Sequence, residues 1–435
     1  MAVPPYDETI NTKPSSLTTP LVSHDGLEEG KIYNGDAHHH NHHHKEGTAS
    51  FFKTCFNGLN ALSGVGILSV PYALSSGGWL TLTLLFIIAA STFFTGLLIR
   101  RCMEIDSDIR TYPDIGERAF GQFGRSVVSV FMYLELYFVA TGFLILEGDN
   151  LYNLFPNMGF EYSWINISGR EGFVIIVALI ILPTVWVQDL GVLSYVSATG
   201  VLASAILIGS VFWTGAFSGV GFHGEGKALN LGGIPPAFSL YALCYGAHPV
   251  FPTLYTSMKD RRQFNKVMVV CFLICTTAYT SMAVLGYLMY GDNVKSQVTL
   301  NLPIGEISSK VAIYTTLVNP VTKYSLMVTP IVLAIESITS YKKRSLSLLI
   351  RTLLLMSTVI VALAVPFFGD LMSLVGAFLS STASIILPCI CYLKISGSYK
   401  KISCELVFVL GNIVMGIGIV ITGTYTSVTQ IIQNL

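Results

Sequence analysis

The sequence predicts an all-α integral membrane protein with about eleven transmembrane helices. Only 11% of its 435 residues are charged, whereas 52% are hydrophobic, and the mean hydropathy is +0.62. A soluble globular domain carries about 25% charged residues, so this chain has too few charges to cover a water-soluble surface. Apolar runs long enough to cross a bilayer recur along most of the chain, which indicates a multi-pass protein with the lipid bilayer as a partner.

Residues 1–48 differ from the rest, because they are polar, contain several prolines and lack an apolar run. We expect a disordered cytosolic tail, since such a segment cannot bury enough apolar surface to offset its ordering entropy. The histidine-rich run at 38–44 could bind a metal ion adventitiously, although we interpret it as a solvated spacer. No cleaved signal peptide is expected. Residues 49–433 are predicted to form one transmembrane domain.

The predicted spans follow from length, because a helix crosses the hydrocarbon core with about 20 residues. They cover 51–76, 78–100, 124–147, 172–190, 192–214, 234–257, 265–290, 310–338, 346–366, 370–393 and 403–430. The boundary between the fourth and fifth spans, at 188–191, is the least sharply marked.

The basic residues set the predicted orientation. Lys and Arg gather in every second loop, notably after the second, sixth, eighth and tenth spans, and the alternate loops carry few of them. Because short cytosolic loops are rich in Lys and Arg, we expect a cytosolic N-terminus and a C-terminus on the far side. The loop of 148–171 then lies on the far side, where the sequon beginning at Asn166 is a candidate glycosylation site.

Composition and motifs exclude several classes of function. The net charge is zero, so no nucleic-acid partner is expected. The eight cysteines fall in apolar segments or in predicted cytosolic loops. We therefore expect neither a disulfide framework nor a metal site. Neither a phosphate-cradling loop nor a nucleophile elbow occurs, so we predict no enzyme, no cofactor and no ATP-driven pump.

The first span contains residues that disfavour a continuous helix. Gly64 and Gly66 each cost roughly 1 kcal/mol in a helix relative to Ala, and Pro71 costs about 3 kcal/mol. Since proline is tolerated in the first turn of a helix, a second half-helix could begin near Ser69. We predict that this span unwinds near mid-membrane, where exposed backbone is permitted only against protein or a water-filled cavity.

The sixth span repeats this device. Within 245–252, Gly246 is followed by Pro249 and Pro252 just past the middle of the span. Paired interruptions in corresponding halves of a chain are typical of the substrate sites of secondary transporters. The alternative is a pair of unrelated kinks in a membrane bundle.

The direction of each half-helix indicates the chemistry of the predicted site. The first span runs outward, so its second half presents backbone N–H groups at the centre, which suit a carboxylate. The sixth span runs inward and presents carbonyl oxygens near Tyr245, which suit an ammonium group. A zwitterion such as an amino acid fits both ends. The predicted substrate-binding residues are Ser63, Gly64, Val65, Gly66, Ile67, Leu68, Tyr137, Tyr245, Gly246 and Ala247.

Three titratable residues inside predicted spans are candidates for ion coupling. Glu135 and Lys323 lie deep in the third and eighth spans, where a charge is costly. They could carry protons, they could simply neutralise each other, or each could have a polar partner of its own. His248 lies in the sixth-span break and could shuttle protons or satisfy freed backbone groups. Tyr137 could line the site or only pack the bundle.

At these residues the chain resembles the amino acid/auxin permease family, in the branch of plant and fungal vacuolar amino acid transporters and vesicular inhibitory amino acid transporters. The resemblance extends over about 50–430. Its motifs are the stretch Phe56–Trp79, the runs Tyr133–Tyr137 and Leu146–Asn150, and Asn319-Pro320-x-x-Lys323-Tyr324.

The resemblance implies a LeuT-type fold, with two inverted five-helix repeats and one extra helix. It also implies proton-coupled transport of amino acids by alternating access, with Lys323 in the place that sodium occupies in related transporters. It favours the vacuolar membrane, with the plasma membrane as the alternative. Glu147 and Asp149, at the end of the third span, are expected to be solvated or interfacial.

Three other functions stay open at this point. The protein could be a nutrient sensor or receptor that binds an amino acid without turnover, or it could be a channel. It could also carry another small carboxylate, such as auxin, on the same fold.

Overall fold

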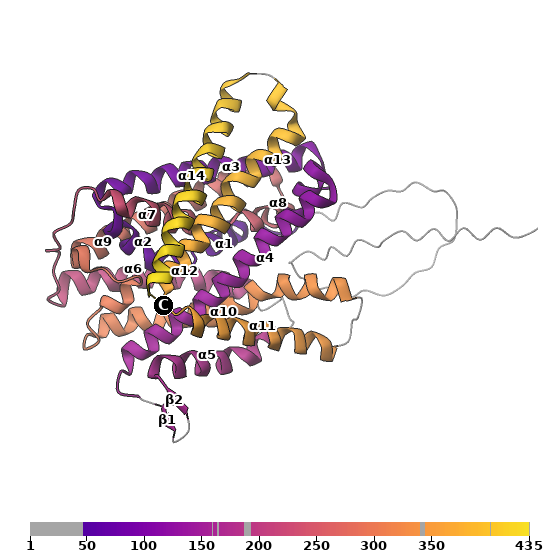
Figure 1. Ribbon diagram of the computed structural model, residues 1–435. Helices are drawn as coiled ribbons and strands as arrows, with labels where there is room; N and C mark the ends of the chain where they lie inside the picture. Colours follow the sequence, from indigo (N-terminus) through magenta and orange to yellow (C-terminus); the bar gives the residue numbers. More distant parts are fainter. Residues whose placement is uncertain are drawn as a thin grey trace, which may run out of the picture.

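The computed structural model describes residues 47–158, 160–162, 165–186, 193–339, 344–400 and 402–434, so the predicted tail and its histidine run lie outside the described residues. The chain is helical almost throughout, and its long helices pack side by side in one bundle (Figure 1). This arrangement confirms the predicted all-α membrane architecture.

Nine helices in the described part of the chain are long and apolar enough to cross a membrane. Eight of them are α3 (Leu82–Ile105), α4 (Tyr112–Leu154), α5 (Gly169–Trp186), α6 (Leu193–Phe217), α9 (Phe264–Tyr290), α10 (Ile307–Thr339), α11 (Arg344–Ala364) and α14 (Cys404–Asn434). The ninth is a composite of α12 (Phe368–Leu374), two π-helical stretches at η8 (Val375–Ser380) and η9 (Thr382–Ile386), and α13 (Leu387–Ser396).

The first and sixth predicted spans are both interrupted, as the sequence predicts. α1 (Phe51–Leu62) and α2 (Gly66–Gly77) meet at a bend of 49° and together satisfy the length and hydropathy of a tenth span. α7 (Ile234–Cys244), the short turn η4 (His248–Val250) and α8 (Phe251–Ser257) occupy the sixth predicted interval. The element order therefore follows the eleven predicted intervals from end to end.

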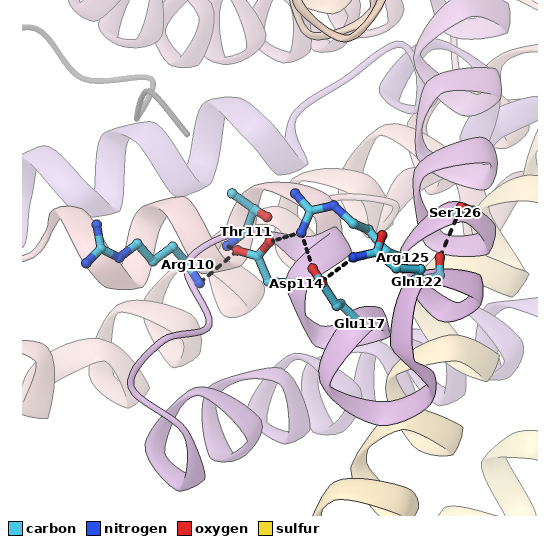
Figure 2. Close-up of polar contacts among 7 residues, drawn as sticks. All are labelled: Arg110, Thr111, Asp114, Glu117, Gln122, Arg125 and Ser126. Carbon is cyan, nitrogen blue, oxygen red and sulfur yellow. Dashed lines mark hydrogen bonds and ion pairs between the residues drawn. The ribbon is translucent and has the colours of Figure 1, made fainter. Parts of the chain in front are cut away.

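α4 begins a dozen or so residues before the predicted third span, because its first part is a short helix that a kink separates from the long one. Phe120 and Gly121 leave helical geometry, and Gly121 adopts φ of 68°, which a residue without Cβ tolerates. Arg125 joins the two sides of the kink, since it lies 2.9 Å from Asp114 and also pairs with Glu117 (Figure 2). This local pairing holds the short helix against the start of the long one.

α4 also ends later than predicted, at Leu154, so the predicted loop of 148–171 is shorter than expected. Its remainder contains an antiparallel hairpin of β1 (Phe160–Tyr162) and β2 (Ile165–Ile167), in which Asn166 is paired with Glu161. The candidate glycosylation residue therefore lies in a small hairpin that projects from the bundle (Figure 1).

Polar contacts sort the connections between helices into two groups. On one face, Arg101 pairs with Glu405 at 2.6 Å, and Ala49 forms a β-bridge with Met258. On the other face, which we call the hairpin face, the backbone N–H of Trp79 donates to Lys227 O at 3.0 Å, and Lys227 pairs with Asp292 at 2.9 Å. The described connections named here thus fall on two faces, as alternating spans require.

The bundle has an apolar exterior and closely packed helices inside. Phe408, Val414 and Ile421 on α14 are 68%, 70% and 64% exposed, as expected for side chains in contact with lipid. Inside, a Cβ built on Gly376 would lie 1.9 Å from the carbonyl oxygen of Ser239, so the η8 and α7 backbones approach closely. Small residues allow such approach, and membrane helices associate largely through this packing.

Candidate substrate site at the broken helices

The break in the first span lies at Ser63–Val65, slightly earlier than predicted. α1 ends as the Ser63 N–H donates to Leu59 O at 2.7 Å, and α2 begins at Gly66 without a side-chain cap. Because the first N–H groups of a helix have no intrahelical partner, those of Gly66 and Ile67 are available here. The prediction that the second half begins near Ser69 is wrong, because Pro71 is accommodated inside α2.

A cavity with an empty volume of about 400 Å³, including the part open to solvent, lies against this break. It is lined by Ser63, Gly64, Val65, Ile67, Leu68, Phe143, Leu146, Ala203, Ser204, Leu207, Thr315, Thr316 and Lys323. Five of the predicted substrate-binding residues, those of the first-span break other than Gly66, thus lie on its wall.

Gly66 faces the sixth span instead of the cavity. A Cβ at this position would lie 2.5 Å from Cys244 Sγ and 3.1 Å from Cys244 Cα. The residue is therefore needed for the close approach of α2 to α7. Gly64 has open space where a Cβ would be, with no heavy atom within 4 Å among the described residues, and it is the glycine that faces the cavity.

Lys323 places a cationic side chain at the first break. It is 4% exposed, and its Nζ donates to Ser63 O at 2.9 Å. This carbonyl belongs to the C-terminal end of α1, where the helix dipole is negative and favours a cation. The Ser63 hydroxyl lies 2.6 Å from that of Ser204 on α6, so the break is also tied to the fifth span.

The predicted residues of the sixth-span break do not reach the cavity. Tyr245 is fully buried, its hydroxyl lies 2.8 Å from Thr276 Oγ1, and its ring stacks on Phe272. Gly246 lies against Glu135, since a Cβ built on it would be 2.8 Å from Glu135 Oε1. Ala247 is buried as well. The sixth break is therefore packed against neighbouring side chains.

Tyr279 on α9 connects the two breaks, which sequence reasoning did not anticipate. Its hydroxyl lies 3.1 Å from Cys244 O and also contacts Leu62 O. These carbonyls end α7 and α1, and the first is next to the oxygens that the sequence predicts for an ammonium group. The Tyr279 hydroxyl therefore contacts one carbonyl oxygen at each break.

Glu135 and Lys323 do not neutralise each other. Glu135 is 5% exposed and accepts a hydrogen bond from the Ser380 hydroxyl at 2.5 Å. Lys323 binds Ser63 O instead, and no ion pair joins the two side chains in the described structure. That alternative is wrong because the two residues lie at different breaks.

His248 and Tyr137 have partners outside the cavity. His248 Nε2 lies 2.9 Å from Thr95 Oγ1 and 3.1 Å from Thr92 O, both on α3. The ring thus joins the sixth-span break to the second span. The Tyr137 hydroxyl donates to Ser357 on α11 at 3.2 Å, which fits a packing role.

The rest of the cavity wall comes from helices without a break. Phe143 and Leu146 on α4, three residues apart, face it from the third span, and α6 and α10 supply the remaining side chains. Continuous apolar spans carry no sequence signal that marks such positions. Arg351, a buried charge on α11, was also missed and donates to Val185 O at 3.1 Å.

The sequence comparisons agree with this geometry. The chain matches the family described as "Transmembrane amino acid transporter protein" over residues 47–429. It is 60% identical to amino acid transporter AVT1I of Arabidopsis thaliana over 392 residues, covering 89% of this chain and 97% of that protein. It is 45% identical to AVT1C of the same plant, with 89% of this chain and 71% of that protein covered.

Two solved structures share the fold at low sequence identity. One is MhsT in complex with L-phenylalanine, with a TM-score of 0.53, 10% identity, and coverage of 89% of this chain and 98% of that one. The other is a mutant manganese transporter of Eremococcus coleocola, with a TM-score of 0.51, 12% identity and the same coverage. The likeness supports the LeuT-type inverted-repeat fold.

Proposed function

Because the chain belongs to the transmembrane amino acid transporter family, we propose that it is a secondary active, proton-coupled carrier of amino acids that works by alternating access. The observation that carries this proposal is the cavity at the first-span break, where an unwound backbone, hydroxyl groups and Lys323 meet. The fold supports it, since substrate sites of such carriers lie at discontinuous helices.

The cavity chemistry suits the two ends of an amino acid. The free N–H groups at the start of α2 would bind the carboxylate, because the N-terminus of a helix attracts anions. The apolar side chains of Ile67, Leu68 and Leu207 would contact the substrate side chain. The lining residues include Lys323 but neither Asp nor Glu, so neutral amino acids fit better than cationic ones. The predicted substrate contacts at Tyr245, Gly246 and Ala247 could form only if the sixth break opened.

Lys323 is the residue we propose for proton coupling at the first break. Its ammonium group is buried, and no carboxylate pairs with it in the described residues. A charge held this way at membrane depth is costly and often marks an ion pathway. Loss of the proton would weaken its hold on Ser63 O and free the end of α1 to move. Glu135 is the candidate at the sixth break, where gain of a proton would weaken the hydrogen bond that it accepts from the Ser380 hydroxyl.

The experiment is uptake of a radiolabelled neutral amino acid into proteoliposomes under an imposed pH gradient. We expect saturable uptake that rises above the external concentration and collapses with a protonophore. Binding without uptake would instead identify a sensor, and flux that does not saturate would identify a channel. Stronger competition by auxin than by any amino acid would assign the cavity to another carboxylate.

We propose the vacuolar membrane as the site of action, with the plasma membrane as the alternative, and a cytosolic N-terminus. The hairpin face would then be luminal or extracellular. If so, Asn166 is accessible to glycosylation, and Asn166→Gln would shift the mobility of the protein in a gel. Cleavage within the hairpin by protease added to the cytosolic side of sealed vesicles would contradict this orientation.

A further inference from the structure

Glu147, expected to be solvated at the end of a span, is buried beside the cavity. It is 1% exposed, and its Oε1 atom has no hydrogen-bond partner among the described residues. It lies on α4 one turn beyond Phe143, which lines the cavity, and next to Leu146, which also lines it. The carboxyl group thus lies between the cavity and the hairpin face.

The charged and titratable groups on the elements around α4 are engaged elsewhere or distant. Arg170 on α5 binds Asp149, Lys323 on α10 binds Ser63 O, and Arg351 on α11 binds Val185 O. Other groups on these elements also have partners of their own: Glu171 (with Ser168 N), Lys295 (with Leu300 O), Tyr324 (with Thr358), Asp370 (with Asn434), His248 (with Thr95) and Tyr392 (with Glu405). Lys310 and Tyr314 are exposed, and Arg100, Arg101, Glu104, Glu336, Arg344 and Lys394 lie at the opposite helix ends. An ionised Glu147 would therefore be uncompensated, which favours its neutral form.

Asn150 offers a partner that only the protonated carboxyl could use. Its Nδ2 donates to Leu146 O and to Gln297 Oε1, both at 2.8 Å, whereas its Oδ1 is buried and has no partner among the described residues. Residues three apart lie on one helix face, so the two side chains that carry these unpaired oxygens share a face of α4. A protonated Glu147 has an O–H group that could donate to Asn150 Oδ1 if the side chain turns towards it, whereas a carboxylate has no proton to donate.

Gln297 connects this pair to the surface. Its Nε2 donates to Asp149 Oδ2 at 2.8 Å, and Asp149 pairs with Arg170, which also donates to Pro366 O. The Arg170 side chain is 28% exposed. The network joins α4, the start of α5, the connection before α10 and the connection between α11 and α12. Opening it would admit water to Glu147 from the hairpin face.

We propose that Glu147 is a further proton-binding site, loaded from the hairpin face, and that its protonation stabilises the closed arrangement of the Arg170–Asp149–Gln297 network. The inference rests on the proposed transport function. One proton passes from water to a carboxylate oxygen of Glu147 while the network is open, and no other covalent bond changes. Neutral Glu147 can then be buried as it is here, and release of the proton accompanies reopening.

The test compares Glu147→Gln with wild type in proteoliposomes of known orientation, with pH varied only on the hairpin face. We expect wild-type uptake to depend on that pH. Glu147→Gln should lose this dependence while it retains saturable amino acid exchange at equal pH on both sides. Glu306→Gln, an exposed carboxyl on the same face, is the matched control and should behave like wild type.

Two results would overturn the proposal. One is that Glu147→Gln keeps its dependence on hairpin-face pH, and the other is that the folded variant also loses exchange, which would make Glu147 structural. If Glu147→Gln does not fold, Glu147→Asp is tested in its place. A shift in the midpoint of the dependence of uptake on hairpin-face pH supports the site, and an unchanged midpoint contradicts it. A wild-type protein that moves no amino acid would overturn the proposed function itself.

Discussion

The two broken spans use the same sequence device but have different surroundings. The break between α1 and α2 borders a cavity, and Lys323 binds a carbonyl at its edge. The break between α7 and α8 is closed by buried side chains, with Glu135 held by Ser380. In the inverted-repeat fold, Lys323 at the first break comes from the third helix of the second repeat. Glu135 at the sixth break comes from the third helix of the first repeat. The comparison indicates a substrate site at the first break and a packed joint at the sixth.

The largest expected effect separates the two charged residues. Lys323→Ala should abolish pH-driven uptake and also raise the KM for substrate, because the side chain lines the cavity. Glu135→Gln should abolish pH-driven uptake with little change in KM, because an amide can still accept from Ser380 and the residue lies outside the cavity. Uptake kinetics at several pH values provide the measurement, with Lys310→Ala as the control on α10. A KM change for Glu135→Gln alone would reverse the assignment.

The second effect concerns the contact that joins the breaks. Gly66→Val should eliminate binding and lower stability, since its Cβ would lie 2.5 Å from Cys244 Sγ and overpacking costs about 1–3 kcal/mol. Gly66→Ala should be partly rescued by Cys244→Ala, which removes the nearest atom. Thermal melting and substrate binding of the single and double variants measure this. Equal stability of Gly66→Ala with and without Cys244→Ala would contradict the packing role.

Gly64 provides the contrast to Gly66. A Cβ there meets nothing within 4 Å in the described structure, so Gly64→Ala should fold normally and affect only substrate affinity. Gly58, which sequence alone would suggest as a tolerant control outside the break, is a poor one. A Cβ on it would lie 2.9 Å from Cys271 Sγ.

A smaller effect is expected at the hydroxyl that joins the breaks. Tyr279→Phe removes the group that contacts Leu62 O and Cys244 O, which should make both carbonyls available to a substrate ammonium group. Binding should tighten by about 1 kcal/mol, roughly the net value of one hydrogen bond and about a fivefold change in Kd. Calorimetry measures it, and unchanged or weaker binding in a folded variant would exclude competition between Tyr279 and substrate.

The last expected effect needs no variant. If the start of α2 binds the substrate carboxylate, an amino acid methyl ester should compete less well than its parent acid. One charge-assisted hydrogen bond contributes about 1.5–3 kcal/mol, which sets the expected difference in apparent affinity at about tenfold or more. Competition by ester and free acid in the same uptake assay measures it. Equal competition by the ester and the free acid would show that the first break does not bind the substrate carboxylate.

Much of the fold could be predicted from the sequence, because lipid demands long apolar helices and penalises exposed backbone. The interruptions at Gly64 and Gly246 were predictable for the same reason, since glycine and proline weaken helices wherever they occur. The exact break was not, because Pro71 is accommodated within α2 and packs against Gly286 on α9. Local propensity places such a residue at a helix start, and tertiary packing overrides it.

The sequence by itself determined the apolar spans, the two breaks and the presence of charges at membrane depth. Each of these depends on residues close together in the chain and on the cost of polar groups in lipid. Only the tertiary structure decided that Lys323 belongs to the first break, that Glu135 belongs to the sixth, and that Glu147 is buried. Those outcomes depend on which helices meet across the bundle, and contacts such as Lys323–Ser63 join residues hundreds of positions apart, for which helical periodicity carries no information.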